Sequence, residues 1–327
     1  MKKLSFLSRF GIVFVLAALV VYFSFATKSF LTMSNLLNVA RQVSMIGVCS
    51  VGMMFVILTG GIDLSVGSAM SFVNVVGAYL MVKVGWRPVP AVIACIVLSA
   101  AAGYTSGFFI TKVRVPPFIA TLAMMNVLGG LAFIISKGMP IFGYPRGFNV
   151  IGQGYVGPVP IPVIIMVVVF AIGSFFLNKT YFGRYFYAIG GNEEASMLAG
   201  INVMRTKQIV YMLSSIFASF AGIIMLSRLN SGMATTGRGF EFQVITAVVL
   251  GGVSITGGSG RVFGVFIGVL IMGVLSNGLI LINMNEYVQQ VVQGAVLVAA
   301  VSVDCISKAR GDKQLKEIKM TSNRESE

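Results

Sequence analysis

The chain has 327 residues, of which 57% are hydrophobic and 10% are charged, and its mean hydropathy is +0.92. A soluble domain carries about 25% charged residues, so this composition excludes an ordinary soluble protein and indicates an integral membrane protein. The net charge of +14 comes from basic residues in short loops and a tail between apolar runs, a pattern of membrane topology rather than of nucleic-acid binding.

Ten apolar segments are candidates for helices that cross about 30 Å of hydrocarbon. They are residues 10–26, 43–59, 66–82, 90–110, 118–135, 161–177, 208–227, 242–255, 262–282 and 287–306. Short Gly-rich turns join the second to the third and the eighth to the ninth. Either pair can instead form a re-entrant hairpin, which would leave eight full spans. The sequence therefore predicts an all-α, polytopic transmembrane bundle with an even number of spans.

The first segment follows Lys2, Lys3 and Arg9 and ends in a small-x-small pattern at Ser24-Phe25-Ala26. Such a pattern is typical of a signal-peptide cleavage site. Because many spans follow, we interpret the segment as an uncleaved anchor, with a cleaved signal as the alternative.

Orientation follows from the distribution of Lys and Arg. With the N-terminus in the cytoplasm, the inner side holds about twice as many of them as the outer side, which predicts that both termini are cytoplasmic. Loop 136–160 then lies outside and loop 178–207 lies inside. Residues 1–307 form one transmembrane domain, and residues 308–327 form a charged cytoplasmic tail.

An aspartate stands in the first Gly-rich turn, where residues 57–68 read ILTGGIDLSVGS. Gly60 and Gly61 stop one helix, and we place Asp63 and Ser65 in the first turn of the next, where side-chain oxygens accept from free backbone N–H groups. A carboxylate at membrane depth also marks function by default. The turn is therefore either a cap or part of a pathway and its inner gate.

The same pattern recurs late in the chain. VILTGGIDLSVGS (56–68) is similar to VVLGGVSITGGSG (248–260) in apolar residues, paired glycines and small polar groups. Transporters often carry internal repeats, although two Gly-rich helix breaks can also resemble each other by chance. Glycines spaced four residues apart occur in the fourth and ninth spans and predict close helix packing, either within the chain or across a dimer.

Amide side chains in the spans are candidates for lining a path for a hydroxyl-rich solute, because an amide both donates and accepts hydrogen bonds. The candidates are Asn74, Asn126, Asn277, Gln289 and Gln293. Hydrogen bonds between helices are the alternative role. We interpret Arg228, Arg238 and Glu241 as solvated charges of an outer loop.

The inner loop contains a short helix signal. Asn192 suits an N-cap, Glu193 and Glu194 suit the first turn, and Gly200 suits the C′ position. A helix from Glu193 to Ala199 is too short to be stable alone. Its apolar surface must rest either on the chain's own membrane domain or on a cytoplasmic partner.

These stretches resemble a known family. Glu194-Ala195-Ser196-x-x-x-Gly200 is similar to the E-A-A-x-x-x-G coupling motif of ATP-binding-cassette (ABC) importer permeases, although Ser replaces the second Ala and the usual downstream Leu-Pro is missing. TGGIDLSVGS (59–68), VPPFIATLAM (115–124) and GRYFYAIGGNEEASMLAGINV (183–203) resemble ribose-, galactose- and xylose-type permeases of bacteria.

The resemblance implies a permease homodimer in the inner membrane that conducts a monosaccharide. It implies a cytoplasmic ATPase subunit seated on Asn192, Glu193, Glu194, Ala195 and Gly200, and a periplasmic or secreted sugar-binding protein. ATP-Mg would be used by the partner, because this chain has no G-x-x-x-x-G-K-[ST] loop.

Three alternatives differ in substrate, in energy source or in the class of protein. Nucleosides and branched-chain amino acids are the nearest other substrates. A stand-alone transporter driven by an ion gradient would need an ion site at mid-membrane, for which Asp63 is the candidate. An enzyme is disfavoured, because the sequence has no histidine, and its cysteines, Cys49, Cys95 and Cys305, form no metal-site spacing.

Overall fold

The computed structural model describes residues 2–325, so the last two residues of the predicted tail, 326–327, lie outside the described part. The helices of the first half are α1 (Lys2–Ala26), α2 (Met33–Leu58), α3 (Val66–Val82), α4 (Pro88–Phe108), α5 (Pro117–Ser136) and α6 (Val150–Gln153). Those of the second half are α7 (Ile161–Lys179), α8 (Tyr181–Gly191), α9 (Glu193–Leu198), α10 (Val203–Leu229), α11 (Phe240–Leu250), α12 (Val262–Leu281) and α13 (Glu286–Glu325).

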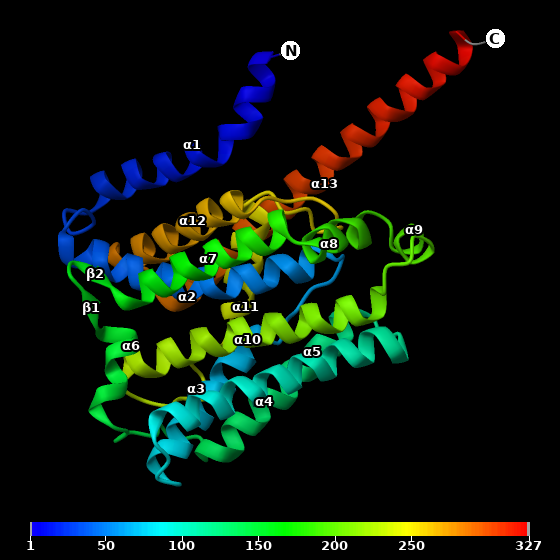
Figure 1. Ribbon diagram of the computed structural model, residues 1–327. Coiled ribbons are helices and arrows are strands. Elements are labelled where there is room, and N and C mark those ends of the chain that lie inside the picture. Colours follow the sequence, from blue (N-terminus) through cyan, green and yellow to red (C-terminus); the bar gives the residue numbers. More distant parts are fainter. Residues whose placement is uncertain (1, 326–327) are drawn as a thin grey trace.

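Minor elements complete the order. A π-helical turn, Phe109–Val113, extends α4, and a 3₁₀ turn, Arg146–Asn149, precedes α6. Strands β1 (Tyr155–Val156) and β2 (Val159–Pro160) form an antiparallel hairpin in the loop before α7. Figure 1 shows this hairpin and α6 at one end of the bundle and α8 and α9 at the other.

The fold class is confirmed, because every predicted apolar segment contains a helix. Seven described helices are long and apolar enough to cross a membrane, whereas the apolar helices at 11–26, 66–82 and 240–250 are shorter. The chain is thus a polytopic helical membrane protein. The count of ten spans and the side on which each terminus lies stay predictions.

Helix α2 forms the centre of the bundle. It packs against α10, α12, α7 and α11, and 89% of its apolar window is buried. By contrast, none of the corresponding window of α13 is buried, and α13 packs mainly on α11. Helix α1 lies along α12 (Figure 1), where the ring of Phe23 fills the space above Gly278.

The spaced glycines pack inside the chain. A Cβ added at Gly103 or Gly107 of α4 would overlap α10. One added at Gly268 of α12 would overlap α11, and one added at Gly264 would overlap Gly251, directly after α11. Small residues at these positions let the helix backbones approach closely. At these four positions the close contact lies within the chain.

The predicted eighth span differs from the structure at its end. The sequence predicts a segment to residue 255, but α11 ends at Leu250 and a turn occupies residues 251–261. Gly252, Gly257 and Gly258 of this turn have positive φ values, a conformation that glycine adopts without the steric cost of a side chain. The second Gly-rich break is therefore a true interruption, like the first.

Candidate functional site

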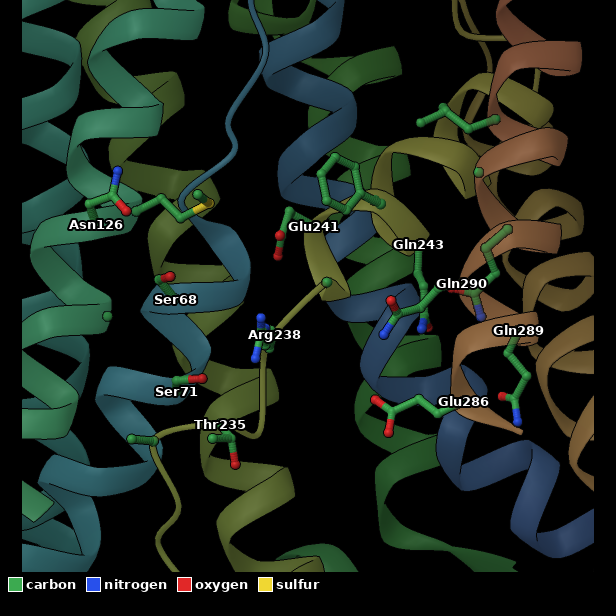
Figure 2. A pocket seen from close by; sticks show the side chains of 18 of the residues that line it. Ser68, Ser71, Asn126, Thr235, Arg238, Glu241, Gln243, Glu286, Gln289 and Gln290 are labelled. Atoms are coloured by element: carbon green, nitrogen blue, oxygen red, sulfur yellow. The ribbon is translucent and has the colours of Figure 1, made fainter. Parts of the chain in front are cut away.

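A cavity of about 1100 Å³ lies between α3 and α5 on one side and α13 on the other. Figure 2 shows Ser68 and Asn126 on the first side, Glu286, Gln289 and Gln290 on the second, and Arg238 and Glu241 between them. The chain segment before α11 and the first turn of α11 supply this middle wall.

About half of the residues that line the cavity carry polar groups, and these suit a hydroxyl-rich solute. Five amides, from Asn126, Gln243, Gln289, Gln290 and Gln293, are joined by the hydroxyls of Ser68, Ser71 and Thr235. Asn126 donates through Nδ2 to the Leu122 carbonyl at 3.1 Å, and among the described residues no hydrogen bond to its Oδ1 is found. Gln293 makes a long 3.4 Å bond to Ser276. Both amides therefore retain hydrogen-bonding capacity for a solute.

The structure brings three of the five predicted lining residues to the cavity, namely Asn126, Gln289 and Gln293. It does not bring the other two. Asn74 is fully buried, accepts from the Met233 backbone at 2.7 Å and donates to the Gly222 carbonyl at 3.5 Å. Asn277 pairs with Asn35. Both of these amides tie helices together.

The prediction of a solvated outer-loop charge is wrong for Glu241. This side chain is only 6% exposed, and it lies at the start of α11, against Gly67 of α3, where a Cβ would overlap the carboxylate. Arg238, three residues earlier, is exposed and lines the cavity. In the sequence, the feature that pointed to this burial was an acidic residue at the start of an apolar run. The glycine that makes room for it lies far away in the sequence.

The turn between α2 and α3 is closed by Asp63. Its Oδ1 accepts from the Ser65 backbone N–H at 2.9 Å and from the Ser65 hydroxyl at 2.6 Å. The geometry differs from the predicted cap, because α3 begins at Val66 and Asp63 precedes the Ser65 N-cap. Ser65 itself makes no capping bond with its side chain. The carboxylate is held by a local turn, and a role in a pathway stays a prediction.

Three backbone segments meet at the end of the bundle that carries α8. They are the end of α2 at Leu58–Gly60, the end of α8 at Gly190–Gly191, and Gly257–Gly258 of the 251–261 turn; we name them together the glycine junction. The Gly258 N–H donates to the Leu58 carbonyl at 3.0 Å, and a Cβ on Gly190 would overlap that carbonyl oxygen. The two similar Gly-rich breaks of the sequence thus contact each other.

Helix α9 forms as its local signals predict. Asn192 Oδ1 accepts from the Ala195 N–H at 2.9 Å, and Lys207 Nζ pairs with Glu193 Oε2 at 2.5 Å. At the other end, Gly200 N donates to the Met197 carbonyl at 3.0 Å and Ile201 N to the Ser196 carbonyl at 3.1 Å. Gly200 has φ +85°, so this is a Schellman closure.

The apolar side of α9 has no cover within the described chain. Met197 is 60% exposed and Leu198 is 90% exposed, while Ser196 faces inward. Of the two surfaces that the sequence left open, the chain's own membrane domain therefore does not bury these side chains. An exposed apolar knob at one end of a membrane bundle suits contact with another protein.

Comparisons with known proteins agree with this geometry. A family model described as "Branched-chain amino acid transport system / permease component" matches residues 35–301. A ribose import permease protein of Bacillus subtilis is 45% identical, over 88% of this chain and 89% of the relative. An L-arabinose ABC transporter permease protein of Azospirillum brasilense is 38% identical, over 91% and 88%. No solved structure matches the chain.

Proposed function

The chain belongs to the family of permease components of branched-chain amino acid type transport systems, and we propose that it forms the translocation path for a pentose in an ABC importer. The observation that carries the proposal is the 45% identity to a ribose import permease protein over 88% of the chain. It is a non-catalytic, multi-pass subunit of the inner membrane, as the permease relatives are.

The cavity between α5 and α13 is the proposed sugar site. A pentose presents hydroxyl groups that both donate and accept, and so do the amides and hydroxyls of Asn126, Gln289, Gln293 and Ser68. Walls formed by helices from both halves of the chain allow the site to change when those helices move. The glycine-rich turn with Gly60, Gly61, Asp63 and Ser65 is the proposed inner gate.

Helix α9 is the proposed seat of the ATPase subunit. ATP-Mg would be bound and hydrolysed by that partner. The exposed side chains of Met197 and Leu198 supply an apolar contact, and Glu194 supplies a charge beside it. Capping by Asn192 and closure at Gly200 keep the short helix formed before the partner arrives.

The remaining features of the assembly follow the same proposal. Two copies of the chain form a homodimer in the lipid bilayer, and a sugar-binding protein docks on the end that carries β1 and β2. Residues 1–307 form the transmembrane domain with ten spans and cytoplasmic termini, and residues 308–327 form the tail. Loop 178–207 then faces the ATPase and loop 136–160 faces the binding protein.

A second substrate class is favoured by one feature of the cavity. Arg238, Glu241 and Glu286 line it together, and these charges match the carboxylate and ammonium groups of an amino acid, which the family description names.

Reconstitution tests the proposal and separates the candidates. The chain is placed in proteoliposomes with a cassette ATPase subunit and a sugar-binding protein from the same organism, and uptake of radiolabelled ribose, arabinose and leucine is measured with and without ATP. We expect ATP-dependent pentose uptake. Leucine uptake would favour the second class, and uptake without the ATPase under a proton or sodium gradient would overturn the ABC mechanism.

A further inference from the structure

The middle of α13 is hydrogen-bonded to the 251–261 turn. Asp304 Oδ2 accepts from the Ser254 hydroxyl at 3.1 Å and from the Ile255 backbone N–H at 3.1 Å. One helical turn later, Lys308 Nζ donates to the hydroxyl of Thr256. Asp304 is half-buried and continues the covered face of α13 that includes Gln293, Leu297 and Ala300. The helix face that lines the cavity at Gln293 and Leu297 therefore also reaches the turn.

The other side of the same turn is in contact with α8. Tyr187 donates its hydroxyl to the Gly260 carbonyl at 3.0 Å, and Gly257 and Gly258 lie against Gly190 and Gly191 in the glycine junction. Direct backbone contact of this kind leaves little room for one segment to move without the other.

Helix α8 continues into α9 without a linker. Asn192 ends α8 as its C-cap and begins α9 as its N-cap. A displacement of α9 by a partner therefore moves α8 as well. Gln293 of α13, a cavity residue, is eleven positions from Asp304, or about 16 Å along a helix.

We propose that Asp304 is a positioning residue that fastens the 251–261 turn to α13, so that movement of α9 and α8 reaches the wall of the cavity. The inference rests on the proposed function, because it takes α9 as the seat of the ATPase and the cavity as the sugar site. The turn and the part of α13 around Asp304 move as one body in this mechanism.

Uptake and ATP hydrolysis are measured together in proteoliposomes for Asp304→Ala, Asp304→Asn and the control Val303→Ala, whose side chain is 68% exposed. We expect Asp304→Ala to retain the ATPase subunit and its hydrolysis rate but to lower sugar uptake about tenfold, a size typical of a coupling contact. Asp304→Asn keeps an acceptor oxygen and should lower sugar uptake less than Asp304→Ala does. An unchanged ratio of sugar to ATP in Asp304→Ala would overturn the proposal.

A covalent link tests the one-body movement and does not depend on how Asp304→Ala folds. Thr256→Cys and Lys308→Cys are joined by a short, reducible thiol cross-linker in a Cys305→Ser background, since Cys49 and Cys95 are buried. In the chain that keeps Asp304, the link should leave uptake intact. In the chain with Asp304→Ala, the link should restore uptake. If the link abolishes uptake and reduction restores it, the contact opens in each cycle and the proposal is wrong.

A failure of the proposed function and a failure of the proposed role of Asp304 give different results. If the unsubstituted chain shows no ATP-driven sugar uptake, the proposed function fails. If it transports sugar while Asp304→Ala keeps normal coupling, only the role of Asp304 fails.

Discussion

Asn35 of α2 and Asn277 of α12 exchange two side-chain hydrogen bonds, each 2.9 Å long, across the buried face between their helices. Each amide donates through Nδ2 and accepts through Oδ1, so the pair is satisfied without water. Asn35 Nδ2 also reaches the Phe30 carbonyl at 2.9 Å. This pair fastens the loop after α1 and the end of α12 to the start of the central helix.

The amide pair predicts a coupled loss of stability. Asn277→Leu leaves Asn35 Oδ1 without its donor and should lower the free energy of unfolding by about 1–2 kcal/mol. Asn35→Leu together with Asn277→Leu should cost less than the two single changes added, because no amide is then left unpaired. Thermal unfolding in detergent measures both, and strict additivity would contradict the pairing.

The exposed knob of α9 predicts loss of the ATPase subunit. Leu198→Asp places a charge at the centre of the proposed contact and should reduce recovery of the ATPase in a pull-down at least about tenfold. Glu194→Lys should act in the same direction. Met139→Asp is the control, since Met139 is an exposed apolar residue, at 72%, in the 136–160 loop. Stoichiometric recovery with Leu198→Asp would remove α9 from the interface.

The hydrogen bonds of Asp63 predict an order among its variants. Asp63→Asn keeps Oδ1 as an acceptor for Ser65 and should retain uptake to within about threefold, the cost of replacing a charged acceptor by a neutral one. Asp63→Leu removes both bonds and should abolish most uptake by loosening the turn. Initial rates of sugar uptake give the order. If Asp63→Asn is as inactive as Asp63→Leu, the charge itself is required.

Asn126 offers a matched test of the cavity. Asn126→Leu removes a hydrogen-bonding group from the wall and should lower kcat/KM for uptake about tenfold. Asn178→Leu is the control, because Asn178 Nδ2 makes the same kind of bond, to the Ser174 carbonyl at 2.9 Å, at the end of α7 and away from the cavity. Equal effects of the two changes would deny Asn126 a role in binding.

The glycine junction predicts opposite results for adjacent residues. A Cβ at Gly190 would overlap the Leu58 carbonyl, whereas nothing lies within 4 Å of a Cβ at Gly191. Gly190→Ala should therefore destabilise the protein by about 1–3 kcal/mol, as overpacking does, and lower uptake. Gly191→Ala should be nearly neutral in both thermal unfolding and uptake. A neutral Gly190→Ala would mean that the junction is looser than the contact indicates.

Local signals in the sequence were sufficient for the helices and for α9. Each apolar run contains a helix because the hydrocarbon core demands internal backbone hydrogen bonding. The ends of helix α9 are determined by local residues, Asn192 and Gly200, so its start and its end can be predicted without knowledge of any distant contact. The break before Asp63 can be predicted for the same reason, although the aspartate lies two residues before the N-cap and not within the first turn as predicted.

Positions around the cavity depend on contacts between distant segments and were predicted less well. Asn74 and Asn126 are both amides within apolar runs, yet one is fully buried between helices and the other lines the cavity. The sequence does not reveal which face of a nearly uniformly apolar helix meets its neighbours. Glu241 was missed for a related reason, because the space that accepts it is created by Gly67, which is more than 170 residues away.

The glycine junction is formed by main-chain atoms, while the polar groups named in the cavity belong to side chains. If the cavity is the proposed sugar site, substitutions in residues 286–298 of α13 will change which solute is recognised without altering the contacts at Leu58, Gly190 and Gly258. A library confined to that segment is then suited to laboratory evolution toward new sugars, because it leaves the parts proposed to couple transport to ATP in their original form.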